Sequence, residues 1–198
     1  MRKTLVFDFG GVLVDWNPHY LLDGYFGSRE KAEWFIQNIC TMEWNGEMDA
    51  GKPIREGVAE RSALYPEYAR DIEVYYARWI EMMGDQIEGM YDLLKELRQR
   101  GYHMYGLTNW SSETFPLVRY KYPIFSLLDG MVVSGEEHCI KPDPKIFRIL
   151  LDRYRLDPSD CVFIDDRLPN VQAAEALGIK GILFSSAEVL RLALFPER

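Results

Sequence analysis

The chain has 198 residues, a formal net charge of −8, 47% hydrophobic residues and 27% charged residues. This length suits one compact domain or a core with a modest insertion, and the composition is that of a globular protein rather than a disordered one. Because the charge is negative and no run of Lys or Arg exceeds two residues, the sequence argues against a nucleic acid partner.

The cysteines and the apolar segments indicate the compartment. The chain has three cysteines without a CxxC spacing, which argues against a disulfide framework and a zinc site. The first apolar run, residues 5–7, is too short for a signal peptide, and no stretch approaches the roughly 18 to 20 apolar residues of a membrane span. We therefore expect a cytoplasmic protein with no membrane partner.

Short apolar runs alternate with helical patterns along most of the chain. The runs are continuous, which is typical of strands that are covered on both faces. They predict strands at residues 4–7, 102–107, 131–133, 161–164 and 181–184. The sequence therefore predicts an α/β fold with a doubly wound, Rossmann-like parallel sheet of five strands.

Three helices are predicted between these strands. One covers residues 87–100 and is closed by Gly101. Another opens with Asp143 as the N-cap and Pro144 at the first helical position. A third follows Pro169 and stops at Gly178.

Residues 16–84 carry only helical signals, with candidate helix starts at residues 17–18, 28, 53 and 66. The last of these helices is expected to run through Trp79 to Met83, and we interpret Trp79, Met82 and Met83 as packing residues. We predict that this block is a small α-helical cap inserted after the first strand. The core then comprises residues 1–15 and 85–198, and the cap lies at the sheet edge where open α/β proteins bind ligands.

Polar residues follow three of the predicted strands. In a parallel sheet these strand ends lie at one edge, so residues far apart in sequence converge there. The residues are Asp8, Thr108, Asn109, Asp165 and Asp166, with Lys141 on a loop before a helix.

This set of side chains favours a phosphate ester. Asp8, Asp165 and Asp166 cannot lie together without a cation, and Mg²⁺ is the cation that suits oxygen ligands best. Thr108 and Asn109 precede a helix that we expect to begin near Ser111, so that they present hydrogen-bond donors to an anion.

Two further features fit the same ligand. Lys141 is expected to add a mobile positive charge beside the anion. Gly10 and Gly11 let the backbone pass close to the anion and turn a carbonyl group toward the metal ion.

These segments together resemble the four motifs of the haloacid dehalogenase-like hydrolases, specifically the members with a helical cap inserted after the first motif. The first motif is similar to residues 8–13 and the second to residues 107–109. The third is similar to Lys141-Pro142, and the fourth to residues 164–166 with Asn170 four residues on. Their order and positions cover nearly the whole chain.

The resemblance implies a role for each residue. Asp8 would attack phosphorus and form an aspartyl-phosphate, which water then hydrolyses. The metal ligands would be Asp8, the Gly10 carbonyl group and Asp166, with Asp165 and Asn170 either binding Mg²⁺ directly or supporting those ligands. The remaining phosphoryl oxygens would be held by Thr108, the Asn109 backbone and Lys141, and Lys141 would also take part in catalysis.

One position departs from the family pattern. Family phosphatases usually carry a second Asp two residues after the nucleophile, which protonates the leaving group, and here that position is Gly10. General acid catalysis is worth about 10²- to 10⁴-fold in rate. Asp15, His19 and Glu47 are possible replacements, and the sequence does not choose among them.

This departure leaves two alternatives to a phosphatase. One is a metal-independent 2-haloacid dehalogenase, although that activity would not require two carboxylates in the fourth motif. The other is a catalytically inactive protein that binds a phosphoester.

The expected substrate is a small phosphorylated metabolite. Aromatic rings and polar groups suit a sugar, and Trp16, Glu47 and Trp110 are the candidate contacts. A hexose phosphate is the first choice, and a nucleotide or flavin phosphate remains open. The sequence gives no indication of the oligomeric state.

Overall fold

The computed structural model describes residues 4–195. Five strands form one parallel sheet in the order β5-β4-β1-β6-β7. The predicted α/β fold is thus confirmed, and each predicted strand lies within one residue of the observed bounds at both ends. The strands are β1 (Thr4–Phe7), β4 (His103–Thr108), β5 (Gly130–Val133), β6 (Cys161–Asp165) and β7 (Lys180–Leu183).

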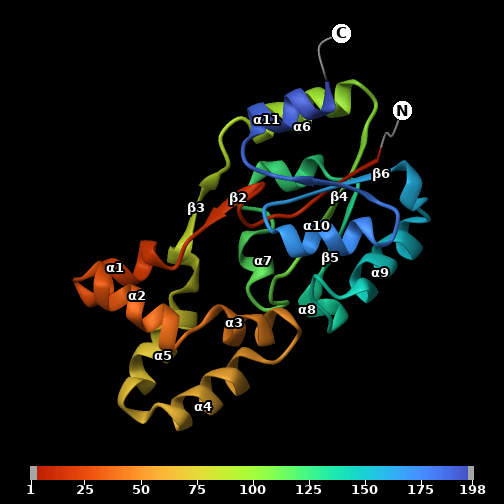
Figure 1. The fold of residues 1–198 in the computed structure, drawn as a ribbon. Helices are drawn as coiled ribbons and strands as arrows, with labels where there is room; N and C mark the ends of the chain where they lie inside the picture. Colours follow the sequence, from red (N-terminus) through yellow and green to blue (C-terminus); the bar gives the residue numbers. More distant parts are fainter. Residues whose placement is uncertain (1–3, 196–198) are drawn as a thin grey trace.

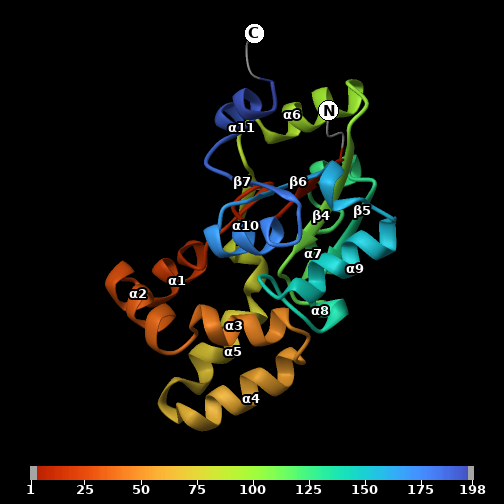
Figure 2. The same cartoon turned by 45° about the vertical axis from the view of Figure 1, so that its right-hand side comes forward.

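Both faces of this sheet are covered, as the continuous apolar runs predict. Leu5 and Phe7 pack into one hydrophobic cluster, and Val6, which points the other way, packs into a second. Helices α6 (Met90–Gln99) and α11 (Ala187–Leu194) lie on one side of the sheet. Helices α9 (Pro144–Tyr154) and α10 (Leu168–Glu175) lie on the other (Figures 1 and 2).

Capping side chains and glycines set the ends of these helices. The Asp143 side chain caps α9 by accepting a hydrogen bond from the Lys145 amide at 2.8 Å, as predicted. Helix α6 begins three residues later than predicted, because Gly89 precedes it with φ at 77°. Helix α10 ends at Glu175, and a turn over residues 176–178 follows it. Two four-residue helices, α7 (Phe115–Val118) and α8 (Ser134–Glu137), complete the core.

Helices α1 to α5 lie together beyond one edge of the sheet (Figure 1). Predicted starts at Ser28 and Pro53 are the N-cap residues of α2 and α4. The sequence did not indicate α3, whose N-cap Thr41 accepts a hydrogen bond from the Trp44 amide at 3.2 Å. The helices are α1 (His19–Phe26), α2 (Arg29–Asn38), α3 (Met42–Asp49), α4 (Ile54–Leu64) and α5 (Ala69–Ala77).

The expectation of an entirely helical insertion is wrong at its two ends. The last helix stops at Ala77, and a 3₁₀ turn (Trp79–Met82) leads into strand β3 (Met83–Gln86). This strand pairs in antiparallel fashion with β2 (Val14–Trp16). The predicted domain boundaries, between residues 15 and 16 and between 84 and 85, therefore fall inside a two-stranded ribbon that leads to the helices.

Apolar packing is continuous from the sheet into the five helices. One cluster of buried side chains contains Leu5 and Phe7 of β1 as well as Phe35, Ile72 and Trp79 of the insertion. Met82 and Met83 are buried in the same cluster, which agrees with their interpretation as packing residues. The insertion is therefore supported by apolar contact as well as by the ribbon.

Among residues 4–195, no helix is both long enough and apolar enough to cross a lipid bilayer.

We expect Gly106→Ala to destabilise the protein, because β4 passes directly over a buried ring. A Cβ atom at Gly106 would lie 2.3 Å from Cε1 and Cζ of Phe9, whose side chain is fully buried. Overpacking of this kind costs about 1 to 3 kcal/mol. Urea unfolding measures the loss: the urea concentration at the midpoint should fall, while the dependence of the unfolding free energy on urea concentration stays unchanged.

Gly24→Ala is the matched control, since Gly24 lies in α1 and a Cβ atom there meets nothing within 4 Å. This change should stabilise the protein by about 0.5 to 1 kcal/mol. Equal midpoints for the two variants would contradict the steric explanation.

Candidate active site

Asp8 lies directly after β1, at the carboxyl edge of the sheet. Its amide donates to the Ile164 carbonyl at 2.9 Å, which fixes the backbone between β1 and β6. Its Oδ1 atom accepts from the Phe9 amide at 2.6 Å and contacts Lys141 Nζ at 2.8 Å. Within residues 4–195 the structure gives Oδ2 no hydrogen-bond partner, so this oxygen is free to react or to bind a cation.

Lys141 holds the centre of the site. Its ammonium contacts Oδ1 of Asp8, Oδ2 of Asp165 and the Leu107 carbonyl oxygen, each at 2.8 Å. Asn109 binds the Lys141 backbone from both sides, with distances of 2.8 Å and 2.9 Å. The expectation of a mobile charge is therefore wrong, because all three protons of a fully buried ammonium are directed at fixed oxygens.

Asp165 is the last residue of β6 and is completely buried. Besides Lys141, its oxygens accept from Asn170 Nδ2 at 3.0 and 3.1 Å and from the Arg167 amide at 2.8 Å. Both oxygens are thus occupied by protein donors. Asp165 is accordingly better placed to orient Lys141 than to bind a metal ion directly.

The Asp166 side chain, in contrast, is exposed to the site. A Cβ atom at Gly11 would lie 2.6 Å from its Oδ2, and Gly11 has φ at 76°, so this position requires glycine. Oxygen atoms of Asp8, Asp165 and Asp166 all lie within 4.8 Å of one another. The three carboxylates exceed the positive charge of Lys141 and of the neighbouring Arg167, and a divalent cation with oxygen ligands would neutralise the remainder.

The pKa of two of these carboxyl groups is raised. Burial raises the pKa of Asp8 to about 7, and Asp165 adds to the rise, while Lys141 opposes it. Burial and the charge of Asp165 also raise the pKa of Asp166. Both shifts follow from the unfavourable burial of negative charge at this site.

Thr108 ends β4 and is buried, and its hydroxyl oxygen has no hydrogen-bond partner within the described chain. An unpaired buried hydroxyl is costly, so it fits a site that receives an anion. The helix that we expected near Ser111 begins only at Phe115, since residues 112–114 form a turn. The N-terminus of this helix therefore does not directly follow Thr108 and Asn109, contrary to our expectation.

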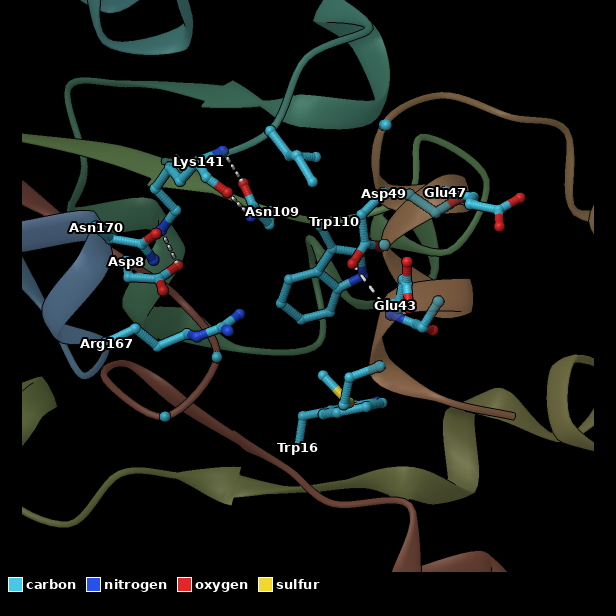
Figure 3. A pocket seen from close by; sticks show the side chains of 18 of the residues that line it. Asp8, Trp16, Glu43, Glu47, Asp49, Asn109, Trp110, Lys141, Arg167 and Asn170 are labelled. Carbon is cyan, nitrogen blue, oxygen red and sulfur yellow. Dashed lines mark hydrogen bonds and ion pairs between the residues drawn. The ribbon is translucent and has the colours of Figure 1, made fainter. Parts of the chain in front are cut away.

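A cavity of about 810 Å³ opens above Asp8 and Lys141, between the carboxyl edge of the sheet and helix α3. Figure 3 shows Asp8, Lys141 and Asn170 on one side and Glu43, Glu47 and Asp49 on the other. The predicted contacts Trp16, Glu47 and Trp110 all line this cavity. Trp79 also lines it, in addition to its packing role, with its ring centroid 5.6 Å from that of Trp110.

Two of the proposed replacement acids lie outside the cavity lining. Asp15 accepts a hydrogen bond from the Tyr20 hydroxyl. His19 is held by Asp23 at 2.6 Å and Glu33 at 2.8 Å. The structure therefore brings only Glu47 of the three to the site.

Sequence reasoning missed two charged residues of the cavity. Arg167 lines it, and Figure 3 shows its side chain beside Asp8. Its position directly after Asp166 was a usable signal. Asp49 was missed because α3 was not recognised, although Met42, Asn45 and Asp49 share a face at helical spacing.

Comparison with known proteins places this geometry in context. A family description of haloacid dehalogenase-like hydrolases matches residues 2–178. The chain is 28% identical over 187 residues to the sesquiterpene phosphatase astK of Aspergillus oryzae, covering 91% of this chain and 88% of that protein. It is 24% identical over 194 residues to the D-ribitol-5-phosphate phosphatase of Bacteroides thetaiotaomicron, covering 91% and 90%.

A solved structure agrees in fold. The magnesium complex of a HAD family enzyme from Bacteroides thetaiotaomicron superposes with a TM-score of 0.73 at 24% identity, covering 98% of each chain. Some relatives are longer proteins, of which the chain spans 34% and 18%.

We expect Mg²⁺ to stabilise the protein and Asp166→Asn to weaken that effect. A ligand that binds only the folded state adds about 2.7 kcal/mol at 100 times its dissociation constant. Asp166→Asn removes one carboxylate of the cluster, so the variant should unfold at a higher temperature than the wild type in EDTA and gain less from Mg²⁺. Thermal unfolding with and without Mg²⁺ measures both differences, and an unchanged gain in the variant would exclude Asp166 as a ligand.

Proposed function

Because the chain belongs to the haloacid dehalogenase-like hydrolases, we propose that it is a Mg²⁺-dependent phosphate-monoester hydrolase with Asp8 as its nucleophile. The observation that carries the proposal is the cluster of Asp8, Asp165 and Asp166 around Lys141 at the floor of the cavity. The relatives named as phosphatases support the same activity.

The proposed reaction proceeds through an aspartyl-phosphate. Oδ2 of Asp8 attacks phosphorus while Lys141 holds Oδ1, so that the nucleophile is fixed in orientation. The Thr108 hydroxyl, which has no hydrogen-bond partner within residues 4–195, donates to a phosphoryl oxygen. Asp8 and Asp166 would hold Mg²⁺, which when bound would supply positive charge for the phosphoryl group beside the carboxylates. Water then releases phosphate from Asp8.

A metal-independent dehalogenase fits the site less well. Such an enzyme would keep Asp165 and Asp166 next to Asp8 with Lys141 and the exposed Arg167 as the neighbouring cations. The three carboxylates would still exceed these cations, and uncompensated negative charge in a partly buried site is unfavourable. The charge balance therefore supports the phosphatase over this alternative.

For the substrate, we propose a sugar or polyol phosphate. Trp16 and Trp110 line the cavity, and their indole N–H groups are buried without a hydrogen-bond partner within residues 4–195. The cavity also presents the Glu43 and Glu47 carboxylates as acceptors. Several hydroxyl groups on a carbon chain would form hydrogen bonds with these donors and acceptors, whereas a plain hydrocarbon chain has no group that would do so.

We expect Asp8→Asn to abolish phosphate release. The purified enzyme should hydrolyse p-nitrophenyl phosphate and sugar phosphates with Mg²⁺ and lose this activity in EDTA. The amide has no nucleophilic oxygen of comparable basicity, so the variant should retain less than about one part in 10⁴ of the rate, following the loss seen when a covalent nucleophile is removed. Acid quenching of the wild type should trap one phosphoryl group on Asp8. Activity that survives Asp8→Asn would refute the mechanism.

We expect Trp110→Phe to raise KM for a sugar or polyol phosphate substrate without changing turnover of p-nitrophenyl phosphate. Phenylalanine keeps an aromatic ring but removes the N–H donor, and a hydrogen bond of this kind is worth about 0.5 to 1.5 kcal/mol. Steady-state kinetics on both substrates measure the split. An equal change for both substrates would show that Trp110 acts through packing alone.

A further inference from the structure

Position 10 leaves an opening where related phosphatases carry an acid. Gly10 lines the cavity, and a Cβ atom built on it meets nothing within 4 Å. No neighbouring side chain of the described residues therefore fills that place. A phosphate monoester with an alkyl leaving group still needs a proton on the departing oxygen, so another group must supply it.

The direction of the leaving group limits where this acid can lie. In phosphoryl transfer the attacking and leaving oxygens are roughly in line with phosphorus. Asp8 attacks from the edge of the sheet, so the leaving oxygen points toward the opposite side of the cavity. Figure 3 shows that helix α3 occupies this side.

Three carboxyl groups of α3 line the cavity: Glu43, Glu47 and Asp49. The Glu43 side chain is exposed, and Glu47 forms an ion pair with Lys52 at 2.8 Å and is 47% exposed. Both side chains are therefore in contact with solvent. Asp49 differs, because it lies at the C-terminal end of α3, half-buried against the core.

Asp49 is held in place from two sides. Asn45 Nδ2 donates to its carboxylate at 3.0 Å, and the backbone amide of Ser111 donates to it from the core. The Ser134 hydroxyl donates to its carbonyl oxygen at 2.5 Å. The carboxyl group therefore has one defined position at the junction of the helical insertion and the sheet.

We propose that Asp49 is the general acid and base of this enzyme, in place of the carboxyl group that position 10 lacks. This inference rests on the proposed phosphatase function. It assigns the role to the carboxyl group that faces Asp8 across the cavity and is neither ion-paired nor freely solvated.

The protonation state of Asp49 agrees with this role. Burial raises its pKa to about 7, and the hydrogen bonds from Ser111 and Asn45 oppose the rise. The negative end of the α3 dipole acts in the same direction as burial. Of the neighbouring titratable groups, Tyr75 and Tyr76 of α5 carry no charge at neutral pH, since burial raises the pKa of both. Glu43 and Glu47, on its own helix, are the negative charges nearest in sequence.

The proton balance closes over the two steps. In the first, Asp8 forms a bond to phosphorus, the ester P–O bond breaks, and the Asp49 proton moves to the departing oxygen, directly or through one water. In the second, a water oxygen attacks phosphorus, its proton moves to the Asp49 carboxylate, and the bond between phosphorus and Asp8 breaks. Asp49 is then protonated again, and the products are an alcohol and inorganic phosphate.

The test compares leaving groups in Asp49→Asn. The amide keeps an oxygen that can accept from the Ser111 amide, so the fold should be retained, but it has no proton of suitable acidity. Turnover of an alkyl phosphate should fall by about 10²- to 10⁴-fold, the usual value of general acid catalysis. The first step with p-nitrophenyl phosphate, whose leaving group needs no proton, should change by less than about tenfold on the same basis. Single-turnover kinetics measure this step separately from hydrolysis of the intermediate.

Two further variants complete the test. The double variant Gly10→Asp with Asp49→Asn should turn over the alkyl phosphate at least tenfold faster than Asp49→Asn alone, because the opening at position 10 admits the new side chain. Glu73→Gln, an exposed change on α5, is the control and should behave as the wild type. The fall of wild-type kcat/KM for the alkyl phosphate above about pH 7 should be absent in Asp49→Asn.

Equal losses for both leaving groups would overturn the proposal and indicate a structural role for Asp49. Unchanged turnover of both would also overturn it, while leaving the phosphatase function intact. If the wild type releases no phosphate from either ester while Mg²⁺ is bound, the proposed function itself fails, and this inference fails with it.

Discussion

The site depends on the Lys141 ammonium, which lies between two buried carboxylates. Asp8 and Asp165 could not both be buried and ionised without it, since each would lack a partner in a region of low dielectric constant. The third proton goes to the Leu107 carbonyl, and Asn109 fixes the Lys141 backbone. One cation thus joins the ends of β1, β4 and β6 to the loop before α9. The same contacts of Lys141 therefore position the nucleophile and hold the edge of the sheet together.

The sequence predicted the members of this cluster but not the way they interact. Asp8, Thr108 and Asp165 were identifiable because polar residues directly follow apolar strands, and strand ends in a parallel sheet meet at one edge. The bonds of Lys141 were not predictable, because they depend on which oxygens three separate segments bring within reach. A lysine on a loop is usually mobile and solvated. Here it is buried because Asp8, Asp165 and Leu107 offer three acceptors at once.

The fold was predictable where the pattern was strong and was missed where the elements were short. Strands such as β1 and β6 carry continuous apolar runs, whereas the ribbon of β2 and β3 contains Asp15, Gly84 and Asp85 and shows no such run. Helix α3 was missed because Gly46 and several polar residues interrupt its apolar pattern. Its stability comes from the Thr41 cap and from burial of Trp44 and Met48, and burial is a tertiary property that a single sequence does not display.

An acid carried by the helical insertion has a consequence that an acid beside the nucleophile does not. The Asp49 carboxylate accepts from Ser111, and its carbonyl accepts from Ser134, so both contacts cross from α3 to the core. A further contact between the insertion and the core comes from α4, where the Ile54 amide donates to the Glu113 carboxylate at 2.7 Å. The position of Asp49 thus depends on contacts between the helical insertion and the core, whereas Asp8 and Lys141 are held by contacts within the core. A substitution that breaks the contacts of α3 with the core would therefore displace the proposed acid and leave the nucleophile in place.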